Sequence, residues 1–424
     1  MSSRRSPLLI IFFTVFIDLL GFGIVLPLLP RYGLHFEADK LTLGFLMASF
    51  SAMQFLFAPL WGRWSDRVGR RPVLLIGLFG STLFYFLFAV VTQRGNLGPI
   101  FGLSPVFWLF VTRIGAGIAG ATIPTAQAYI ADVTDAKSRG KGMALIGAAF
   151  GIGFTFGPLI GAAFVRADKL DAPSAAPGYV AAALSGVAFL WALTMLPESL
   201  KRGVAPAPGR KWFDVSSLRR AVGLPYVGWV LASIFLTTFA FAQFESTLSL
   251  LTEDRGISDR GNFLVFAYIG FILTLAQGFL VRRLLPKLGE FRMATIGVAL
   301  MSCGLLGIGA ATLPENRAVS LALLFCVLPV CVVGFSATTP SLQSLLSLNS
   351  ASDEQGGILG VGQSISSLAR ILGPIAGLGL QKWTVAMPYW FGAGLMAAAA
   401  LLILTLRGAR QGHAAHGTAT EPTV

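Results

Sequence analysis

Residues Gly62–Arg71 read GRWSDRVGRR, and they separate two long apolar runs, 41–61 and 72–92. The stretch holds one carboxylate, Asp66, among four arginines. Each flanking run has the roughly 20 apolar residues that a helix needs to cross a bilayer. The pattern predicts a membrane-spanning helical hairpin whose charged turn forms charge-assisted hydrogen bonds between helix ends. The alternative interpretation is a solvated basic loop that only fixes the orientation of the hairpin.

The composition of the whole chain agrees with a membrane protein. Of the 424 residues, 55% are hydrophobic and 12% are charged, and the mean hydropathy is +0.74. Because soluble domains are about 25% charged, this composition argues against a soluble enzyme. A net charge of +13 would suggest a nucleic-acid partner in a soluble protein. Here the basic residues lie in the gaps between apolar runs, so we expect the lipid bilayer as partner and no nucleic acid.

Apolar runs continue on both sides of the hairpin and predict twelve spanning helices in two sets of six. The first set is 8–30, 41–61, 72–92, 105–128, 142–166 and 178–197, and the second is 226–251, 262–281, 293–312, 318–341, 357–379 and 387–406. Short patterns recur about half a chain apart, as Gly157-Pro158 and Gly373-Pro374 do, which is typical of transporters with duplicated halves. The predicted fold class is an all-α polytopic membrane protein with two pseudo-symmetric six-helix bundles. The predicted domains are an N-terminal bundle at 1–197, a basic cytoplasmic linker at 198–225, a C-terminal bundle at 226–406 and a disordered cytoplasmic tail at 407–424.

The loops between the spans divide the positive charge unequally. One side of the membrane collects 21 lysines and arginines and the other collects nine. Cytoplasmic loops carry the excess of basic residues, so the sequence predicts that both termini and the linker are cytoplasmic. A multi-pass protein of the plasma membrane, the inner membrane in a bacterium, is the expected localisation.

Four charged residues lie inside predicted spans, where each costs roughly 2.5–3.5 kcal/mol on insertion. They are Asp18, Arg113, Glu245 and Arg370. A carboxylate that is alternately buried and paired can bind and release a proton, so Asp18, Glu245 and Arg113 are the candidates for proton coupling. The alternative is that each is a paired or neutralised residue that only holds helices together.

A substrate cavity in such a protein needs an apolar lining with a few polar anchors. The candidates are polar and aromatic residues of the spans: Gln54, Gln127, Phe239, Gln243, Phe244, Tyr268, Gln363 and Arg370. Most of the 34 phenylalanines face lipid or pack between helices in this interpretation.

Signals of catalysis, cofactors and metals are absent or misleading. Gly115–Gly120 matches a dinucleotide-binding pattern, but it lies inside an apolar helix with no preceding strand. The chain has no P-loop sequence, and its three cysteines lie in apolar runs without a metal-binding spacing. We expect no enzyme activity, no catalytic residues, no cofactor and no metal.

The turn at 62–71 closely resembles the signature after the second helix of the major facilitator superfamily, with Trp64 in place of the usual leucine. Asp18–Val25 resembles the first-helix pattern of the drug:proton antiporters of this family, and Arg113 with Tyr129–Asp132 resembles the fourth-helix pattern, where Ala116 replaces a frequent glutamine. The resemblance implies the major facilitator fold. It also implies a cytoplasmic gate, formed by Gly62, Asp66, Arg67, Gly69, Arg70, Arg71 and Asp132.

The fifth span contains GFTFGPLIGA at 153–162, close to the antiporter motif, with Ala162 in place of a final glycine. Glycines four residues apart allow close helix packing, and a proline permits a bend. Ordinary packing is the plain interpretation, whereas the resemblance implies export and a gating role for Gly153, Gly157, Pro158 and Gly161.

These observations predict a secondary transporter that resembles the tetracycline-type and multidrug proton antiporters. We expect it to export hydrophobic or amphipathic small molecules in exchange for protons by alternating access, and to function as a monomer. One alternative is a proton-coupled porter of a metabolite such as a sugar, a siderophore or an organic anion. Another is a receptor for lipid or ligand that does not transport.

Overall fold

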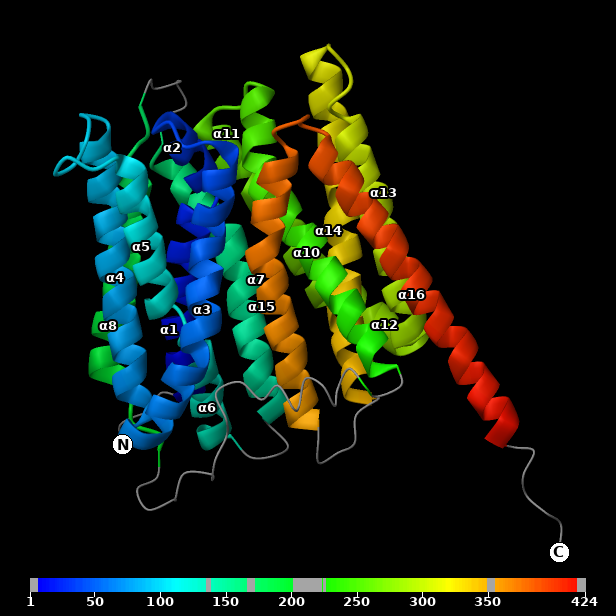
Figure 1. Ribbon diagram of the computed structural model, residues 1–424. Coiled ribbons are helices and arrows are strands. Elements are labelled where there is room, and N and C mark those ends of the chain that lie inside the picture. The colour runs from blue at the N-terminus through cyan, green and yellow to red at the C-terminus, as the bar shows by residue number, and fades with distance from the viewer. Residues whose placement is uncertain are drawn as a thin grey trace, which may run out of the picture. The chain divides into compact units, whose positions relative to one another are not determined.

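The computed structural model describes residues 7–134, 139–165, 172–200, 223, 226–348 and 355–417. Within these ranges nearly the whole chain is helical (Figure 1). One isolated bridge, between Ile100 and Leu103, lies in the connection that follows α4 (Arg70–Gly95). The predicted all-α fold class is confirmed.

Eleven helices of the described residues are long and apolar enough to cross a membrane. They are α1 (Pro7–Val25) with α2 (Leu29–His35), α3 (Lys40–Val68), α4, α5 (Pro105–Ala119) with α6 (Ile123–Val133), α8 (Ala176–Met195), α10 (Val227–Asp254), α11 (Asp259–Leu275) with η1 (Ala276–Val281) and α12 (Arg282–Leu288), α13 (Glu290–Ala310), α14 (Arg317–Leu348), α15 (Gln355–Leu380) and α16 (Met387–Gly417). The remaining predicted span, 142–166, coincides with α7 (Arg139–Ala163), whose described apolar part is Ala148–Ala163. Every predicted span therefore falls on a helix.

Three of the spans are interrupted helices, which the sequence did not predict. A turn at 26–28 separates α1 from α2, because Pro27 and Pro30 lack the N–H that would continue the helix. A turn at Gly120–Thr122 separates α5 from α6, which begins with a proline in its first turn. In the third, the π-helical segment η1 separates α11 from α12.

The last helix is longer than expected. The sequence predicts that the final span ends near residue 406, but α16 continues to Gly417. The first part of the tail predicted as disordered is thus helical, because alanines continue the helix and no proline stops it before that point. Residues 418–424 lie outside the described residues.

By their internal contacts the described helices form two compact units. Unit 1 comprises residues 1–212, 245–274 and 374–382, and unit 2 comprises 213–244, 275–373 and 383–424. Three spans pass from one unit to the other: α10 after Phe244, α11 just before η1, and α15 between Gly373 and Pro374. The predicted division at a 198–225 linker stays a prediction, and most of that linker lies outside the described residues.

Unit 1 contains two hydrophobic clusters that differ in their origin. One contains Ile10, Leu74 and Tyr129, and every residue in it precedes position 200. The other joins Leu28 and Leu43 to residues much later in the chain, Leu250, Phe263 and Leu378. We call the end of unit 1 where α4 begins the Arg70 end, and the end that carries α2 the Arg31 end. The core is made of the first half of the chain at the Arg70 end, and of both halves at the Arg31 end.

Candidate functional site

The turn between α3 and α4 holds a network around Arg70, which is buried. Arg70 Nη1 donates hydrogen bonds to Ser65 Oγ at 2.8 Å and to Asp66 Oδ1, and its Nε donates to Asp132 Oδ2 at 3.1 Å. Gly69 lies between the two helices with φ +111°, a conformation that favours glycine. The structure therefore brings the end of α3 and the end of α6 to one guanidinium at the start of α4.

Glu198 completes this network, and the sequence did not single it out. Its carboxylate accepts hydrogen bonds from the backbone N–H groups of Arg70 at 2.9 Å and Arg71 at 3.1 Å. These are the first donors of α4, which have no partner within the helix, and Gly69 has no side chain to cap them. A Cβ on Gly69 would overlap the Glu198 carboxylate. The uncapped start of α4 was the available signal, but nothing local points to a residue 128 positions away.

Most of the predicted gate residues meet in this Arg70 network, defined as Ser65, Asp66, Arg70, Arg71, Asp132 and Glu198. Gly62 accepts a hydrogen bond at its carbonyl oxygen from Ser65 Oγ at 2.6 Å, and Arg71 Nη2 donates to the carbonyl of Leu193 at 2.7 Å. Arg67 is exposed and donates none of these bonds. Among the described residues, every partner in the network precedes position 200. Its role as a gate stays a prediction.

Asp18, in α1, faces the interior of unit 1. Ser185 of α8 donates a hydrogen bond from its Oγ to Asp18 Oδ1 at 3.1 Å. A small cavity of about 20 Å³ lies beside it, lined also by Leu74 and Leu78 of α4. This volume is enough for about one water molecule. The carboxylate is thus held by a hydroxyl, and within the described part of the chain it forms no salt bridge.

Arg113, in α5, is 2% exposed. Its guanidinium carbon lies over the Phe50 ring, 4.4 Å from the centroid, and Phe50 stacks on Phe22 at 4.9 Å. Neither Nε nor Nη1 of Arg113 has a hydrogen-bond partner among the residues that the structure describes. A cation–π contact compensates only part of the cost of burying a charge.

The glycines of α7 pack closely, as the small-residue spacing predicts. A Cβ on Gly157 would lie 2.9 Å from the Leu20 carbonyl oxygen of α1, and a Cβ on Gly161 would overlap the ring of Phe263 in α11. Gly153 lies against Leu19 in the same way, and Pro158 is inside the helix. These residues thus fix the contact of α7 with α1 and α11, while a gating role stays a prediction.

A second buried arginine, Arg31, anchors a network that sequence reasoning missed. Arg31 lies in α2 and is 5% exposed. Its Nε donates to the Ser249 carbonyl at 3.2 Å and its Nη2 to Thr252 Oγ1 at 2.9 Å. Its Nη1 donates to the Ile257 carbonyl at 3.0 Å and to Asp259 Oδ1 at 2.8 Å. All of these acceptors belong to the end of α10, the following turn and the start of α11.

Further polar contacts join the same segments. Pro27, in the turn between α1 and α2, accepts at its carbonyl oxygen from Ser249 Oγ at 2.7 Å and from Asn262 Nδ2 at 2.8 Å. Asn262 also binds Ser249 Oγ at 3.0 Å and Thr252 Oγ1 at 2.8 Å. We call these residues the Arg31 network: Pro27, Arg31, Ser249, Thr252, Ile257, Asp259 and Asn262.

An exposed ion pair lies at the start of α3, where Asp39 caps the helix. Lys382 Nζ donates to Asp39 Oδ2 at 2.8 Å, and the Thr42 backbone N–H donates to Asp39 Oδ1 at 3.0 Å. The Lys382 hydrogen bond, followed by those from Thr42, holds the pKa of Asp39 well below its usual range. Lys40 Nζ also donates to the Gln381 carbonyl at 2.7 Å.

Comparison with known proteins identifies the family. The model of the Major Facilitator Superfamily matches residues 11–374. The chain belongs to the major facilitator superfamily. It is 32% identical to the tetracycline resistance protein, class C, of Escherichia coli over 423 residues, which cover 98% of this chain and 99% of the relative. It is 26% identical to multidrug resistance protein 2 of Bacillus subtilis over 93% of this chain and 94% of the relative.

A solved structure gives the same result. The crystal structure of the human organic anion transporter MFSD10 superposes with a TM-score of 0.67 and 26% identity, over 95% of this chain and all of that one. Because its relatives are transporters, this facilitator is a multi-pass membrane transporter and not an enzyme.

The predicted cavity residues of the transporter have unlike surroundings. Gln243 and Phe244 are buried in α10. Gln243 Nε2 donates to the Pro388 carbonyl at 2.5 Å, a bond that joins α10 to α16.

The other predicted cavity residues differ in burial. Phe239 is also buried, and Gln54 Nε2 donates to the Gly120 carbonyl at 3.1 Å. Tyr268 is half-buried, and the exposed candidates are Gln127, Gln363 and Arg370. Glu245, predicted for proton coupling and not for the cavity, is also half-buried. That the cavity candidates line one cavity stays a prediction.

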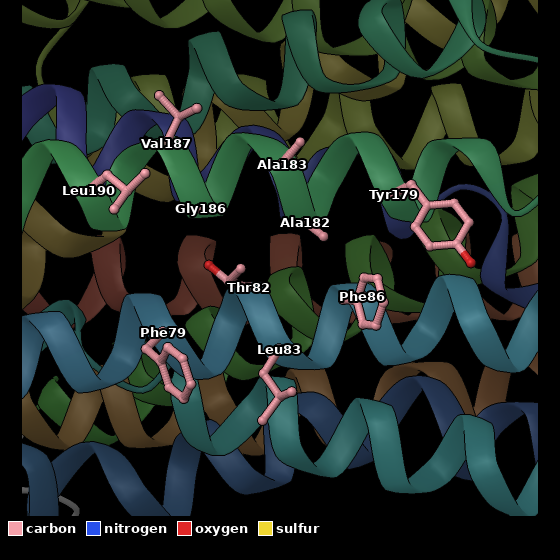
Figure 2. A pocket seen from close by; sticks show the side chains of 10 residues that line it. All are labelled: Phe79, Thr82, Leu83, Phe86, Tyr179, Ala182, Ala183, Gly186, Val187 and Leu190. Atoms are coloured by element: carbon pink, nitrogen blue, oxygen red, sulfur yellow. The ribbon is translucent and has the colours of Figure 1, made fainter.

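The transporter also carries an apolar groove of about 540 Å³ between α4 and α8 (Figure 2). Phe79, Phe86 and Leu190 line it, and Thr82 and Tyr179 supply its polar atoms. In a membrane-spanning bundle, an exposed apolar surface of this kind contacts lipid. None of the predicted cavity residues lines it.

Proposed function

We propose that this transporter exports hydrophobic or amphipathic small molecules in exchange for protons, by alternating access. Similarity to a tetracycline resistance protein along nearly the full length of both chains supports this substrate class, and the glycine-rich α7 supports export. The observation that carries proton coupling is the position of Asp18 in a membrane span, beside a hydroxyl and a small cavity.

Asp18 has the surroundings that a proton site needs. A salt bridge would hold a carboxylate in its charged form, whereas the Ser185 hydroxyl can donate to the charged form or accept from the protonated one. The adjacent cavity has room for a water molecule that could deliver the proton. Asp18 therefore binds the proton in this proposal, Arg113 senses its charge within the same unit, and Glu245 has the corresponding role in α10.

The orientation of the transporter follows from its loops. The Arg70 end carries the larger share of the basic residues, so we place it in the cytoplasm together with both termini. The Arg31 end then faces the outside. A single chain contains both halves that alternating access requires, so we propose that the monomer is functional.

Proton flux in inside-out vesicles tests this function. Vesicles with an acidic lumen are challenged with tetracyclines, lipophilic cations, organic anions and sugars, and collapse of the pH gradient is recorded. A tetracycline or lipophilic cation should release protons with the wild type. Asp18→Asn should insert normally but lower substrate-dependent proton release at least 20-fold, because an amide cannot exchange the proton.

The control variant is Asp254→Asn, which removes a carboxylate that is half-exposed at the end of α10. It should retain wild-type proton release. Normal release by Asp18→Asn would exclude Asp18 as the coupling site. Proton release with none of the compounds, from folded and inserted protein, would contradict proton-coupled export and favour a receptor that binds without transport.

A specific observation favours one second candidate, an organic anion as substrate. The buried guanidinium of Arg113 has donors without partners in the described part of the chain, and aromatic rings lie beside it. A carboxylate with an apolar body would satisfy both. The structural relative MFSD10 is an organic anion transporter. In the same assay, proton movement with organic anions alone, lost in Arg113→Gln, would support this candidate.

A further inference from the structure

We propose that Arg31 is the latch of the outer end of the transporter: its bonds hold that end closed, and they break together when the end opens. The inference rests on the proposed alternating access, but it depends neither on the substrate nor on proton coupling. The Arg31 network is confined to unit 1, yet it joins residues 27–31 to residues 249–262, which belong to different halves of the sequence.

The first argument is the number of bonds that one side chain makes. A guanidinium has five N–H donors in a planar fork. Arg31 uses Nε, Nη1 and Nη2 for four bonds to four different residues. Its acceptors lie on two helices and the turn between them. The guanidinium therefore cannot rotate away from one acceptor without also losing its bonds to the others. A lysine has one nitrogen at this position and cannot reach all four acceptors.

The second argument is electrostatic. Ser249 and Thr252 lie in the last turns of α10, where carbonyl groups carry the negative end of the helix dipole. Asp259 begins α11 and adds a full negative charge. The buried cation is therefore compensated by residues from the second half of the chain, and all four of the bonds described above are lost if those residues move away.

The third argument is the polar chain behind Arg31. Thr252 accepts from Arg31 and is bonded to Asn262, which is bonded to Ser249 and to the Pro27 carbonyl. All three side chains are fully buried. In such a network, loss of one bond leaves other buried groups unsatisfied, so partial opening is unfavourable. Complete opening admits water to every group. The network thus favours two discrete arrangements, closed and open.

The hydrophobic core at this end has the same origin. Leu250 follows Ser249 and Phe263 follows Asn262 in the sequence, and both belong to the cluster that contains Leu28 and Leu43. Residues 245–274 belong to unit 1 by their contacts, although they are part of the second set of predicted spans. The structure therefore has its Arg31 end closed, and Arg31 is the charged group at the centre of the closure.

Distances between spin labels test the latch. Labels are attached to Leu97→Cys, in the connection after α4, and to Leu313→Cys, in the connection after α13; both positions are highly exposed. The three native cysteines are first replaced by alanine. The protein is placed in lipid nanodiscs, and the ratio of the long to the short distance population measures opening of the outer end.

Arg31→Ala should raise the ratio of open to closed populations at least tenfold. Arg31→Lys should raise it at least threefold, because the charge remains but the fork is lost, and this conservative variant serves if the alanine variant does not insert. Asp259→Asn should raise it about twofold. The matched control is Arg260→Ala, an exposed arginine next to Asp259, which should stay at the wild-type ratio.

Wild-type ratios for both Arg31→Lys and Arg31→Ala would overturn the latch, and so would an equal shift in Arg260→Ala. A role in stability alone would lower the melting temperature without changing the ratio, which also overturns it. Proton release is measured on the same variants. A shifted ratio in a protein that moves no protons with any compound would support the latch and contradict only proton-coupled export.

Discussion

The two ends of unit 1 are each organised by a buried arginine, but the two arginines connect different parts of the chain. In the described residues, the partners of Arg70 lie in α3, α6 and the segment after α8, all within the first half. The partners of Arg31 lie 218 or more positions away, in α10, α11 and the turn between them. A network within one half can persist in every state of a transporter, whereas one between halves must break when they separate. We therefore expect the Arg70 network to contribute to stability and the Arg31 network to contribute to the choice between conformations.

Among variants that distinguish the two ends, we expect Arg70→Ala to have the largest effect, and we expect that effect to be on stability. Removal of this guanidinium leaves Asp66 and Asp132 without their shared partner. Because both carboxylates are partly exposed, we expect a loss of about 2–3 kcal/mol in the free energy of unfolding. The ratio of the Leu97–Leu313 distance populations should stay within twofold of the wild type.

Unfolding in detergent micelles and label distances in nanodiscs measure these two quantities on one variant. A shift of the distance ratio towards the closed outer end would break the comparison, because the Arg70 network would then also act as the gate that the family resemblance implies. Unchanged stability would show that water replaces Arg70 as the hydrogen-bond partner of Asp66 and Asp132.

A smaller effect is expected at the start of α4. Glu198→Gln keeps the shape of the cap but removes its charge from the helix N-terminus, which should cost about 0.5–1 kcal/mol in the free energy of unfolding. The distance ratio should not change, because Glu198 binds only within the first half in the described structure. Glu37→Gln, an exposed glutamate at the other end, is the control and should have no measurable effect. A shift in the ratio for Glu198→Gln would link the cap to conformational change.

The smallest effect concerns the pair of Asp39 and Lys382, which joins the halves but is exposed. Since the pKa of Asp39 is lowered in the folded protein, its contribution is fully present above the usual carboxyl pKa of about 3.9 and is lost as the pH falls towards the lowered value. Label distances at pH 7 and pH 5 should therefore show the same small difference, less than twofold, between the wild type and Asp39→Asn. A difference that disappears already at pH 5 would mean that Lys382 does not hold Asp39 ionised.

The sequence was sufficient for the spans and insufficient for the contacts between them. A run of apolar residues identifies a span because the bilayer acts on each helix alone, and every predicted span coincides with a helix. The charged turn at 62–71 was informative because its residues meet across a few positions. Glu198 and Arg31 escaped notice because their partners are distant in sequence and are largely backbone groups, which no residue type reveals.

The breaks in the spans had a different cause. Pro27 and Pro30 were visible in the sequence, but prolines are tolerated in membrane helices when neighbours satisfy the freed backbone groups. Here Ser249 of α10 and Asn262 of α11 bind the Pro27 carbonyl, so the interruption depends on residues of two other spans. Gln243, a predicted polar anchor for substrate, likewise donates to the Pro388 carbonyl at the start of α16, a contact with a distant backbone group that the sequence does not reveal.

The carbonyl acceptors of Arg31 bear on how the protein can diverge over evolution. Ile257 contributes only its main-chain oxygen to the bond with Arg31, and any amino acid would provide that atom. This bond therefore does not constrain the side chain at position 257, whereas Arg31 and Asp259 must be retained together for their ion pair to survive. Among descendants of a common ancestor, covariation of residue types would therefore reveal only the side-chain pairs of this network. The bonds to backbone carbonyl groups would be conserved through the backbone conformation and would leave no covariation.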